Sequence, residues 1–264
     1  MDSLAKAGCL YGVELWGWQR SADMERFQSR YVKMAMGLSR NTPGYLWKLE
    51  SGRRTIGIEA LKRAARYACR VQSMEANRWP KICLKEEARQ ALNNKPTHVG
   101  KAVKKIQEET RNEKILQMIW DGAEDGDLLE ELEKMLEVRI QQDIEKDQEK
   151  INESNYCPWY KEIAPEVTGA TYWNDRSTKI CIKEQWARLR CGNVGRRLAQ
   201  GFKNVSCRAC RTEEESMSHI VACDRAQSLI NQERVRELRG WLEGRPGEIP
   251  LERYIVEALK GDPI

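Results

Sequence analysis

The chain has 264 residues, of which 41% are hydrophobic and 32% are charged, and its formal net charge is +5. That length allows one or two domains, and the high charged fraction favours several helices with wide hydrated faces. Nine cysteines in a chain of this length do not suggest a secreted disulfide framework. The N-terminus lacks the features of a signal peptide, and no apolar stretch has the length of a membrane span. We therefore expect an intracellular protein, nuclear or cytoplasmic, with reduced thiols and no membrane association.

Charge is unevenly distributed along the chain. Residues 121–150 contain twelve acidic and four basic side chains, so the remainder carries a surplus of thirteen positive charges. Such a surplus favours polyanionic partners, because each phosphate that is neutralised releases counterions. RNA, DNA or both are therefore the expected partners, and a hydrated basic surface without any partner is the alternative.

The first predicted elements lie before residue 45. The apolar stretch 10–18 fits either a strand or the start of a helix. Ser21 is a candidate N-cap for a helix that ends near Gly37, because apolar residues recur behind it at three- and four-residue steps. The Asn-Thr-Pro-Gly sequence at 41–44 then predicts a turn.

A second helix is predicted over residues 57–76. Its apolar face consists of Ile58, Leu61, Ala65, Ala68 and Val71. Basic residues occupy the rest of this helix or directly precede it, namely Arg53, Arg54, Lys62, Arg63, Arg66 and Arg70. An amphipathic helix of this kind packs on one side and presents cations on the other, and we expect these six basic residues to contact nucleic-acid phosphates.

Residues 81–150 are charged and helix-prone, with breaks at Asn93-Asn94-Lys95-Pro96 and at Asp121-Gly122. The acidic part contains an apolar stripe formed by Leu129, Leu132, Leu136, Ile140 and Ile144. The stripe is too short for a regular coiled coil, so we expect a helix docked on its own chain. Pairing with a partner, including self-association, stays open.

The last part of the chain is predicted to be an irregular linker over 152–178, a helix over 180–191, and closing helices over 224–243 and 251–260. The expected fold class is all-α, with at most a short hairpin near the cysteines. Three regions are expected: a helical region at 1–80, a charged helical connector at 81–150, and a cysteine-containing region with C-terminal helices at 151–264.

The sharpest local motif places Cys207, Cys210, His219 and Cys223 in a Cys-x2-Cys-x8-His-x3-Cys pattern. A Cys-x2-Cys pair sets two thiolates on one turn, and four such ligands close a tetrahedral Zn²⁺ shell without an open position. The site is therefore expected to be a structural zinc site, which in small modules contributes roughly 10 kcal/mol or more. Chance proximity of these residues without a metal is the alternative.

Cations surround this motif. Arg208 and Arg211 flank the ligands, while Arg188, Arg190, Arg196, Arg197 and Lys203 precede them. We interpret these basic residues as contacts for nucleic-acid phosphates. Trp186 is expected in the core, Cys157, Cys181 and Cys191 are expected to be packing residues, and His98 is expected to be exposed.

Several segments resemble the C-terminal region of non-LTR (LINE-type) retrotransposon reverse transcriptases. Residues 10–17 are similar to the family's LYG-x-E-x-W segment, and residues 37–46 to its G-L-x-R-x-T-P-G-Y run. Residues 160–163 and 187–193 are similar to later segments, and the cysteine motif resembles the terminal CCHC finger. The family usually places four residues between the histidine and the last cysteine, whereas this chain has three.

The resemblance implies a thumb-like helical unit joined to a zinc knuckle, both of which grip RNA or DNA. The palm aspartates that catalyse reverse transcription have no counterpart, since the chain contains no Asp-Asp pair. We therefore expect a non-catalytic nucleic-acid-binding protein rather than an enzyme. The alternatives are a protein–protein adaptor that uses the acidic helix and the zinc unit, or a remnant without selected function.

Overall fold

The computed structural model describes most of the first 193 residues and a few later ones. The described residues are 2–95, 97–157, 160–163, 171–174, 176–177, 179–193, 206–207, 210–214 and 219. Within them every regular element is helical, apart from one antiparallel bridge between Ser206 and Glu214. The predicted all-α fold class is therefore confirmed, while the closing helices predicted over 224–243 and 251–260 lie outside the described residues.

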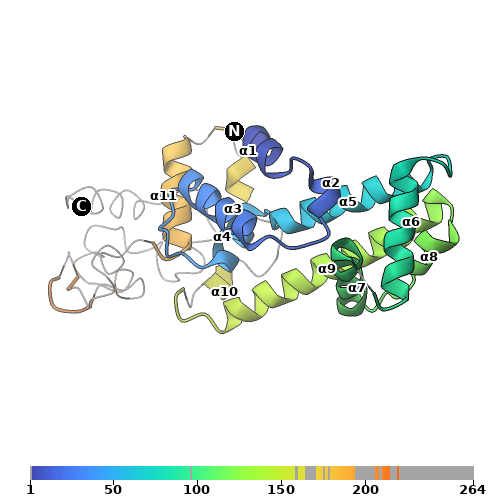
Figure 1. Cartoon of the computed structure of the whole chain (residues 1–264). Coiled ribbons are helices and arrows are strands. Elements are labelled where there is room, and N and C mark those ends of the chain that lie inside the picture. Colours follow the sequence, from blue (N-terminus) through green and yellow to red (C-terminus); the bar gives the residue numbers. More distant parts are fainter. Residues whose placement is uncertain are drawn as a thin grey trace. The chain divides into compact units, whose positions relative to one another are not determined.

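Eleven α-helices and one 3-10 helix occur in the described part of the chain (Figure 1). They are α1 (Asp2–Cys9), α2 (Val13–Trp16), α3 (Ala22–Ala35), α4 (Gly44–Ser51), α5 (Ile56–Gln72), α6 (Trp79–Leu92), α7 (His98–Thr110), α8 (Ile115–Asp121), α9 (Asp125–Asn152), α10 (Tyr160–Ile163), η1 (Thr171–Asn174) and α11 (Ile180–Arg190).

The chain divides into two compact units, each built from two separate stretches. Unit 1 comprises Met1–Gln28 and Arg54–Lys146, and unit 2 comprises Ser29–Arg53 and Asp147–Ile264. One boundary falls within α3 and another within α9. The units therefore interleave along the sequence, whereas the three expected regions follow one another.

Helix α3 has the ends that its sequence predicts. The Ser21 hydroxyl accepts a hydrogen bond from the Met24 N–H at 3.4 Å, which satisfies one of the N–H groups left free at a helix start. Beyond the last residue, Gly37 adopts a left-handed conformation with φ 66°, which lets the chain turn away. The apolar stretch before α3 forms the one-turn helix α2, so it is helical and not a strand.

Helix α5 forms one wall of the core of unit 1. Ala64, Ala65 and Ala68 on its buried face are at most 2% exposed, and such small side chains let neighbouring helices approach closely. The helix ends at Gln72, four residues before the predicted end. There the Ser73 hydroxyl donates a hydrogen bond to the Arg70 carbonyl at 2.9 Å and competes with continuation of the helix.

Helices α6 to α9 complete this core. The chain breaks between α6 and α7 and between α8 and α9 at the predicted positions, and Gly122 adopts a left-handed conformation with φ 79°. The core contains side chains from α5 to α9 and from the segment after α2; its buried members include Trp18, Leu61, Ala88, Val103, Ile106, Ile115, Ile119, Leu128, Leu132, Met135 and Leu136.

The acidic helix α9 is docked on its own chain, as predicted. Leu128, Leu132 and Met135 are fully buried in the unit 1 core, and Leu136 is 7% exposed. The predicted stripe is displaced in register, since its members Leu129, Ile140 and Ile144 are only partly buried. The buried part of this face is occupied within the chain, and pairing with a partner through the remaining part of the helix stays a prediction.

Unit 2 is organised by the short helix α4, which directly follows the predicted turn. Leu46 and Trp47 of α4 are buried, and the Trp47 indole donates a hydrogen bond to the Ser29 hydroxyl at 3.1 Å. The Asn193 side-chain oxygen accepts hydrogen bonds from the Ser39 N–H at 2.6 Å and from the Thr42 hydroxyl at 2.9 Å. These contacts tie the residues around α4 to the end of α11.

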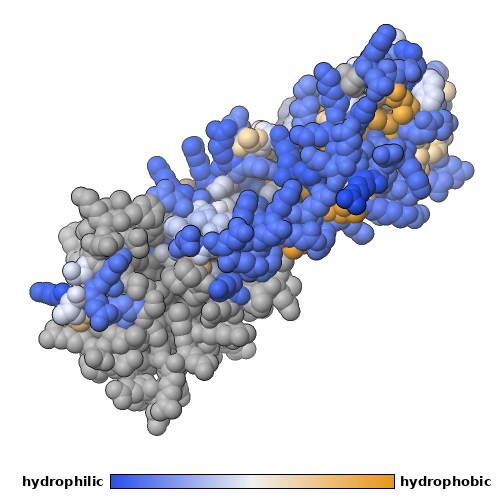
Figure 2. Space-filling view, turned by 90° about the horizontal axis from the view of Figure 1, so that it is seen from below, coloured by the Kyte–Doolittle hydropathy of each residue, from blue (hydrophilic) through white to orange (hydrophobic). Residues whose placement is uncertain are grey.

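Hydrophilic side chains cover most of the coloured surface on the face shown in Figure 2. The longest described helix, α9, has 28 residues but carries charged side chains in every turn. None of the described helices combines the length and the apolarity needed to cross a membrane.

Candidate metal centre and basic helix

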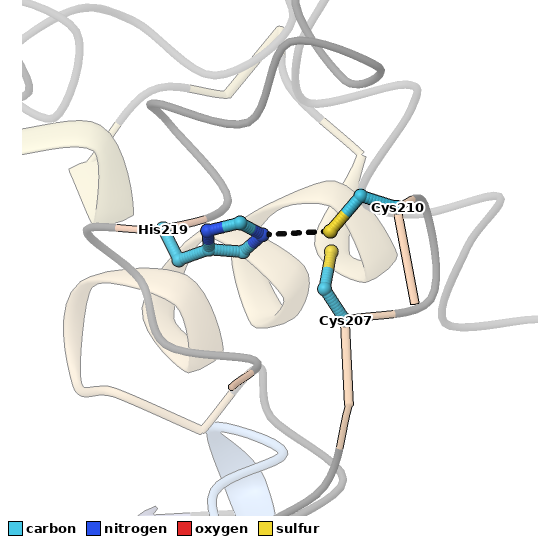
Figure 3. Close-up of side chains that lie close together, drawn as sticks. All are labelled: Cys207, Cys210 and His219. Atoms are coloured by element: carbon cyan, nitrogen blue, oxygen red, sulfur yellow. Dashed lines mark hydrogen bonds between the residues drawn. The ribbon is translucent and has the colours of Figure 1, made fainter. Parts of the chain in front are cut away.

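Cys207 and Cys210 lie on a tight turn that is held by backbone hydrogen bonds. The Cys207 N–H donates a hydrogen bond to the Glu213 carbonyl at 2.7 Å, and the Arg211 N–H donates one to the Cys207 carbonyl at 2.8 Å. Arg211 has φ 62°, a left-handed conformation that is uncommon for a residue other than glycine. The turn brings both thiols to the same side of the backbone, facing His219 (Figure 3).

The ligand atoms of Cys207, Cys210 and His219 lie within 4.8 Å of one another and could hold a metal ion. The Cys210 sulfur and the His219 Nε2 are 3.3 Å apart. Tetrahedral Zn²⁺, with bonds of about 2.3 Å to sulfur and 2.0–2.1 Å to nitrogen, would separate such a pair by about 3.6 Å. The donor set is therefore close to the spacing that a bound ion requires.

A carboxylate orients the histidine. An oxygen of the Glu213 side chain lies 2.9 Å from the His219 Nδ1, on the side of the ring away from the cysteine sulfur. Carboxylates commonly hold metal-binding histidines in this way, and they fix both the tautomer and the orientation of the ring. The sequence motif alone assigned Glu213 no such role.

Hydrogen bonds favour the thiolate form of Cys210. The Thr212 hydroxyl donates to the Cys210 sulfur at 3.1 Å and contributes most to lowering the pKa of Cys210 to about 5. The backbone N–H groups of Thr212 and Glu213, and the contact with His219, lower this pKa further. A thiolate is the form that binds metal, so this sulfur is prepared for coordination near neutral pH. Cys223, the fourth predicted ligand, lies outside the described residues.

The predicted basic side of α5 is exposed to solvent. Lys62, Arg63, Arg66 and Arg70 are all exposed, and none has a side-chain hydrogen bond or ion pair with another described residue. Their spacing places them within about a quarter of the helix circumference, along roughly 12 Å of its axis. We call these four residues the basic face of α5.

The other predicted nucleic-acid contacts differ in how far their side chains are exposed. Arg54 and Arg211 are exposed, whereas Arg53 and Arg188 are partly buried. Four more basic residues, Arg196, Arg197, Lys203 and Arg208, lie outside the described residues. Only the basic face of α5 therefore gathers several predicted contacts on one described surface.

Arg190 was expected to contact phosphates, but it is buried in a polar centre of unit 2. The Glu50 carboxylate, which is 0% exposed, accepts hydrogen bonds from the Arg190 Nε at 2.7 Å, the Tyr160 hydroxyl at 2.8 Å and the Tyr172 hydroxyl at 2.7 Å. We call these four residues the Glu50 centre. Because Arg190 is only 6% exposed and its charge is neutralised by Glu50, its predicted role at the surface has to be corrected.

Most expectations about isolated residues are confirmed. Trp186 is 1% exposed and belongs to the core, and Cys157 and Cys191 are fully buried. Burial raises the pKa of both thiols, which keeps them protonated. Cys181 differs from the expectation, since it lies on the exposed side of α11 and is not a packing residue. His98 is exposed as expected, as the first residue of α7.

The metal-ligand group belongs to unit 2 and the basic face of α5 to unit 1, and each is defined by contacts within its own unit. The resemblance to retrotransposon polymerases rests on the sequence motifs alone. No protein-family model matches the chain, and neither a curated protein nor a solved structure matches it.

Proposed function

We propose that this protein binds nucleic acid without catalysing a reaction, through the basic face of α5 and a structural zinc centre at Cys207, Cys210, His219 and Cys223. The observation that carries the proposal is the set of four exposed cations on α5 without an acidic partner among the described residues. The resemblance to the C-terminal region of LINE-type polymerases supports the same function.

The basic face of α5 is suited to a phosphate backbone for two reasons. Its cations lie on a helix whose opposite side is buried in the core, so their backbone positions are fixed before binding. Among the described residues no carboxylate is paired with them, so no such ion pair has to be broken when a phosphate approaches. Contacts of this kind recognise charge and spacing rather than base sequence.

The donor atoms of the metal centre favour zinc. Thiolates and imidazoles together suit Zn²⁺, and a shell of three cysteines and one histidine leaves no position for a reactive water. The ion would therefore hold the chain in place around the turn and would not act on a substrate. The exposed Arg211, on the same turn, would add a cation beside the centre.

Binding of labelled RNA and DNA oligonucleotides, followed by fluorescence anisotropy at low salt, tests the nucleic-acid proposal. The variant Arg63→Gln/Arg66→Gln should bind about tenfold more weakly than the unmodified protein, because two phosphate contacts are lost. The matched control is Arg26→Gln/Arg89→Gln, which removes two arginines that are already paired with Asp23 and Glu86. Equal affinities of the two variants, or no binding by the unmodified protein, would contradict the proposal.

Metal analysis after reconstitution tests the zinc centre. About one zinc per chain is expected, and Cys210→Ser should abolish tight binding. Glu213→Gln should weaken zinc binding about tenfold or more, because the carboxylate that orients His219 is lost. The neighbouring Glu214→Gln serves as its control. A metal-free protein, or equal zinc affinity of the two glutamine variants, would speak against this assignment.

A further inference from the structure

Unit 1 contains a cavity of about 310 Å³. Its lining does not include any residue of the basic face of α5. It is lined by the segment after α2 and by α5, α7 and α9. The lining residues of α5, among them Leu61, differ from the cations of its basic face. Pockets that take small organic ligands begin at about 300 Å³, so the volume suits a ligand of modest size.

The charged side chains that line the cavity are mostly cationic. Arg20, Lys101, Lys105 and Arg139 face it together with a single acid, Glu109. Lys101 makes no ion pair with a described residue, and the Lys105 ammonium is 4.0 Å from the Glu109 carboxylate. The two lysines are four residues apart on α7, so they project from the same side of the helix.

Carboxylates occupy only part of the binding capacity of the two arginines. Arg20 is paired with Asp143 and also lies near Glu25, and Arg139 is paired with Glu109, so three acids are present near four cations. The positive charge that remains corresponds to about one unit charge, and it lies on the side of Lys101 and Lys105. An incoming anion would therefore neutralise the cavity, whereas a neutral ligand would leave the lysines uncompensated.

Arg139 supplies unused hydrogen-bond donors within this lining. The residue is 8% exposed, and only its Nη1 forms hydrogen bonds, to Glu109 and to Gln142. The Nε and Nη2 groups, with three N–H bonds, have no hydrogen-bond partner among the described residues. The planar guanidinium matches the oxygen spacing of a phosphate, and charge-assisted hydrogen bonds of this kind are strong.

Apart from Gln19, the rest of the lining consists of apolar residues and glycines. Trp18, Ile58, Leu61 and Ile106 are at most 8% exposed and line the same cavity. A ligand that also covers these side chains would gain by burying apolar surface. We propose that the cavity binds a small phosphomonoester with an apolar or flat body, whose phosphate contacts Lys101, Lys105 and Arg139.

Isothermal titration calorimetry with adenosine 5′-monophosphate as the probe tests this proposal. We expect one binding site per chain, with adenosine and inorganic phosphate each at least about tenfold weaker. The comparison with adenosine measures the contribution of the phosphate group, and the comparison with inorganic phosphate measures the contribution of the rest of the ligand. A mononucleotide that does not bind at millimolar concentration, or adenosine that binds equally well, would overturn the proposal. Inorganic phosphate binding as tightly as the mononucleotide would overturn the role of the apolar lining.

Variants locate the binding in the cavity. Lys101→Gln/Lys105→Gln should weaken mononucleotide binding about tenfold or more, since two charge-assisted contacts are lost. Two controls remove the same charge elsewhere in unit 1: Lys134→Gln/Lys146→Gln on α9, and Arg63→Gln/Arg66→Gln on the basic face of α5. Both controls should bind the mononucleotide unchanged. A loss in either control as large as in the Lys101/Lys105 variant would show diffuse attraction to positive charge and would refute a defined site.

Discussion

The basic face of α5 in unit 1 and the Glu50 centre in unit 2 use arginine in opposite ways. On α5 the guanidinium groups of Arg63, Arg66 and Arg70 are exposed and have no acidic partner among the described residues. In the Glu50 centre the guanidinium of Arg190 is buried and bonded to a carboxylate that two tyrosines also contact. The difference shows that the number of arginines in a region does not by itself determine how many of their charges reach the solvent.

Removing Glu50 should have the largest effect on stability, because it removes the carboxylate at the middle of the Glu50 centre. Glu50→Ala removes the carboxylate that the buried Arg190 guanidinium contacts, and breaking a buried ion pair in this way costs about 3–5 kcal/mol of folding free energy. Urea denaturation measures the loss, and Glu75→Ala is the control, since Glu75 is exposed and its side chain has no partner in the described part of the chain. Equal stability of the two variants would mean that the Glu50 centre does not hold unit 2 together.

High pH should disturb the same centre without a substitution. Burial raises the pKa of Tyr160 and Tyr172 well above the ordinary value, and the nearby charge of Glu50 adds to the effect. Because their folded-state pKa is raised, these groups stabilise the fold fully below the unfolded-state pKa. That contribution is lost as the pH rises, since the unfolded chain then releases protons that the folded chain retains.

The pH range over which stability falls is set by the pKa values of these groups in the unfolded chain. Stability should begin to fall near pH 9, where the thiols of Cys157 and Cys191 ionise in the unfolded chain, and fall more steeply above pH 10. Each such group costs about 1.4 kcal/mol per pH unit. Tyrosinate absorbance should show two tyrosines that titrate only on unfolding. If every tyrosine titrates in the folded protein near pH 10, this description of the centre is wrong.

A smaller effect is expected from a substitution beside the basic face of α5. Glu59 lies one helical turn before Lys62 and Arg63 and is the nearest acid in sequence to the basic face of α5. Glu59→Gln should tighten binding of an oligonucleotide about two- to threefold at low salt, by reducing local repulsion of phosphates. Anisotropy titrations with Glu75→Gln as the control would reveal this. Weaker binding by Glu59→Gln than by the control would contradict the proposed surface.

Local patterns in the sequence predicted much of the fold. The Ser21 cap, the amphipathic period of α5 and the breaks near Asn93 and Gly122 each depend on residues within one or two helical turns. The group that could hold a metal ion was also predictable, since Cys207, Cys210 and His219 lie within thirteen residues and their spacing favours this clustering. Helix α4 was missed because it is short and directly follows a turn signal.

The Glu50 centre could not be predicted in this way. Its contacts join Glu50 to residues 110, 122 and 140 positions later, and no periodicity in the sequence links such distant residues. The arginine-rich run before the cysteines therefore suggested a surface role for Arg190, although tertiary packing places that residue inside. Whether a particular arginine is paired is a property of the folded chain and not of its local composition.

The salt dependence of oligonucleotide binding tests the central claim most directly. If the basic face of α5 contacts phosphates, the logarithm of the association constant should fall linearly with the logarithm of the salt concentration. Arg63→Gln/Arg66→Gln should reduce that slope by nearly two for duplex DNA, and by about 1.4 for a single strand. Its folding free energy should stay within about 0.5 kcal/mol of that of the unmodified protein. A slope that the double substitution leaves unchanged would show that phosphates do not contact this helix.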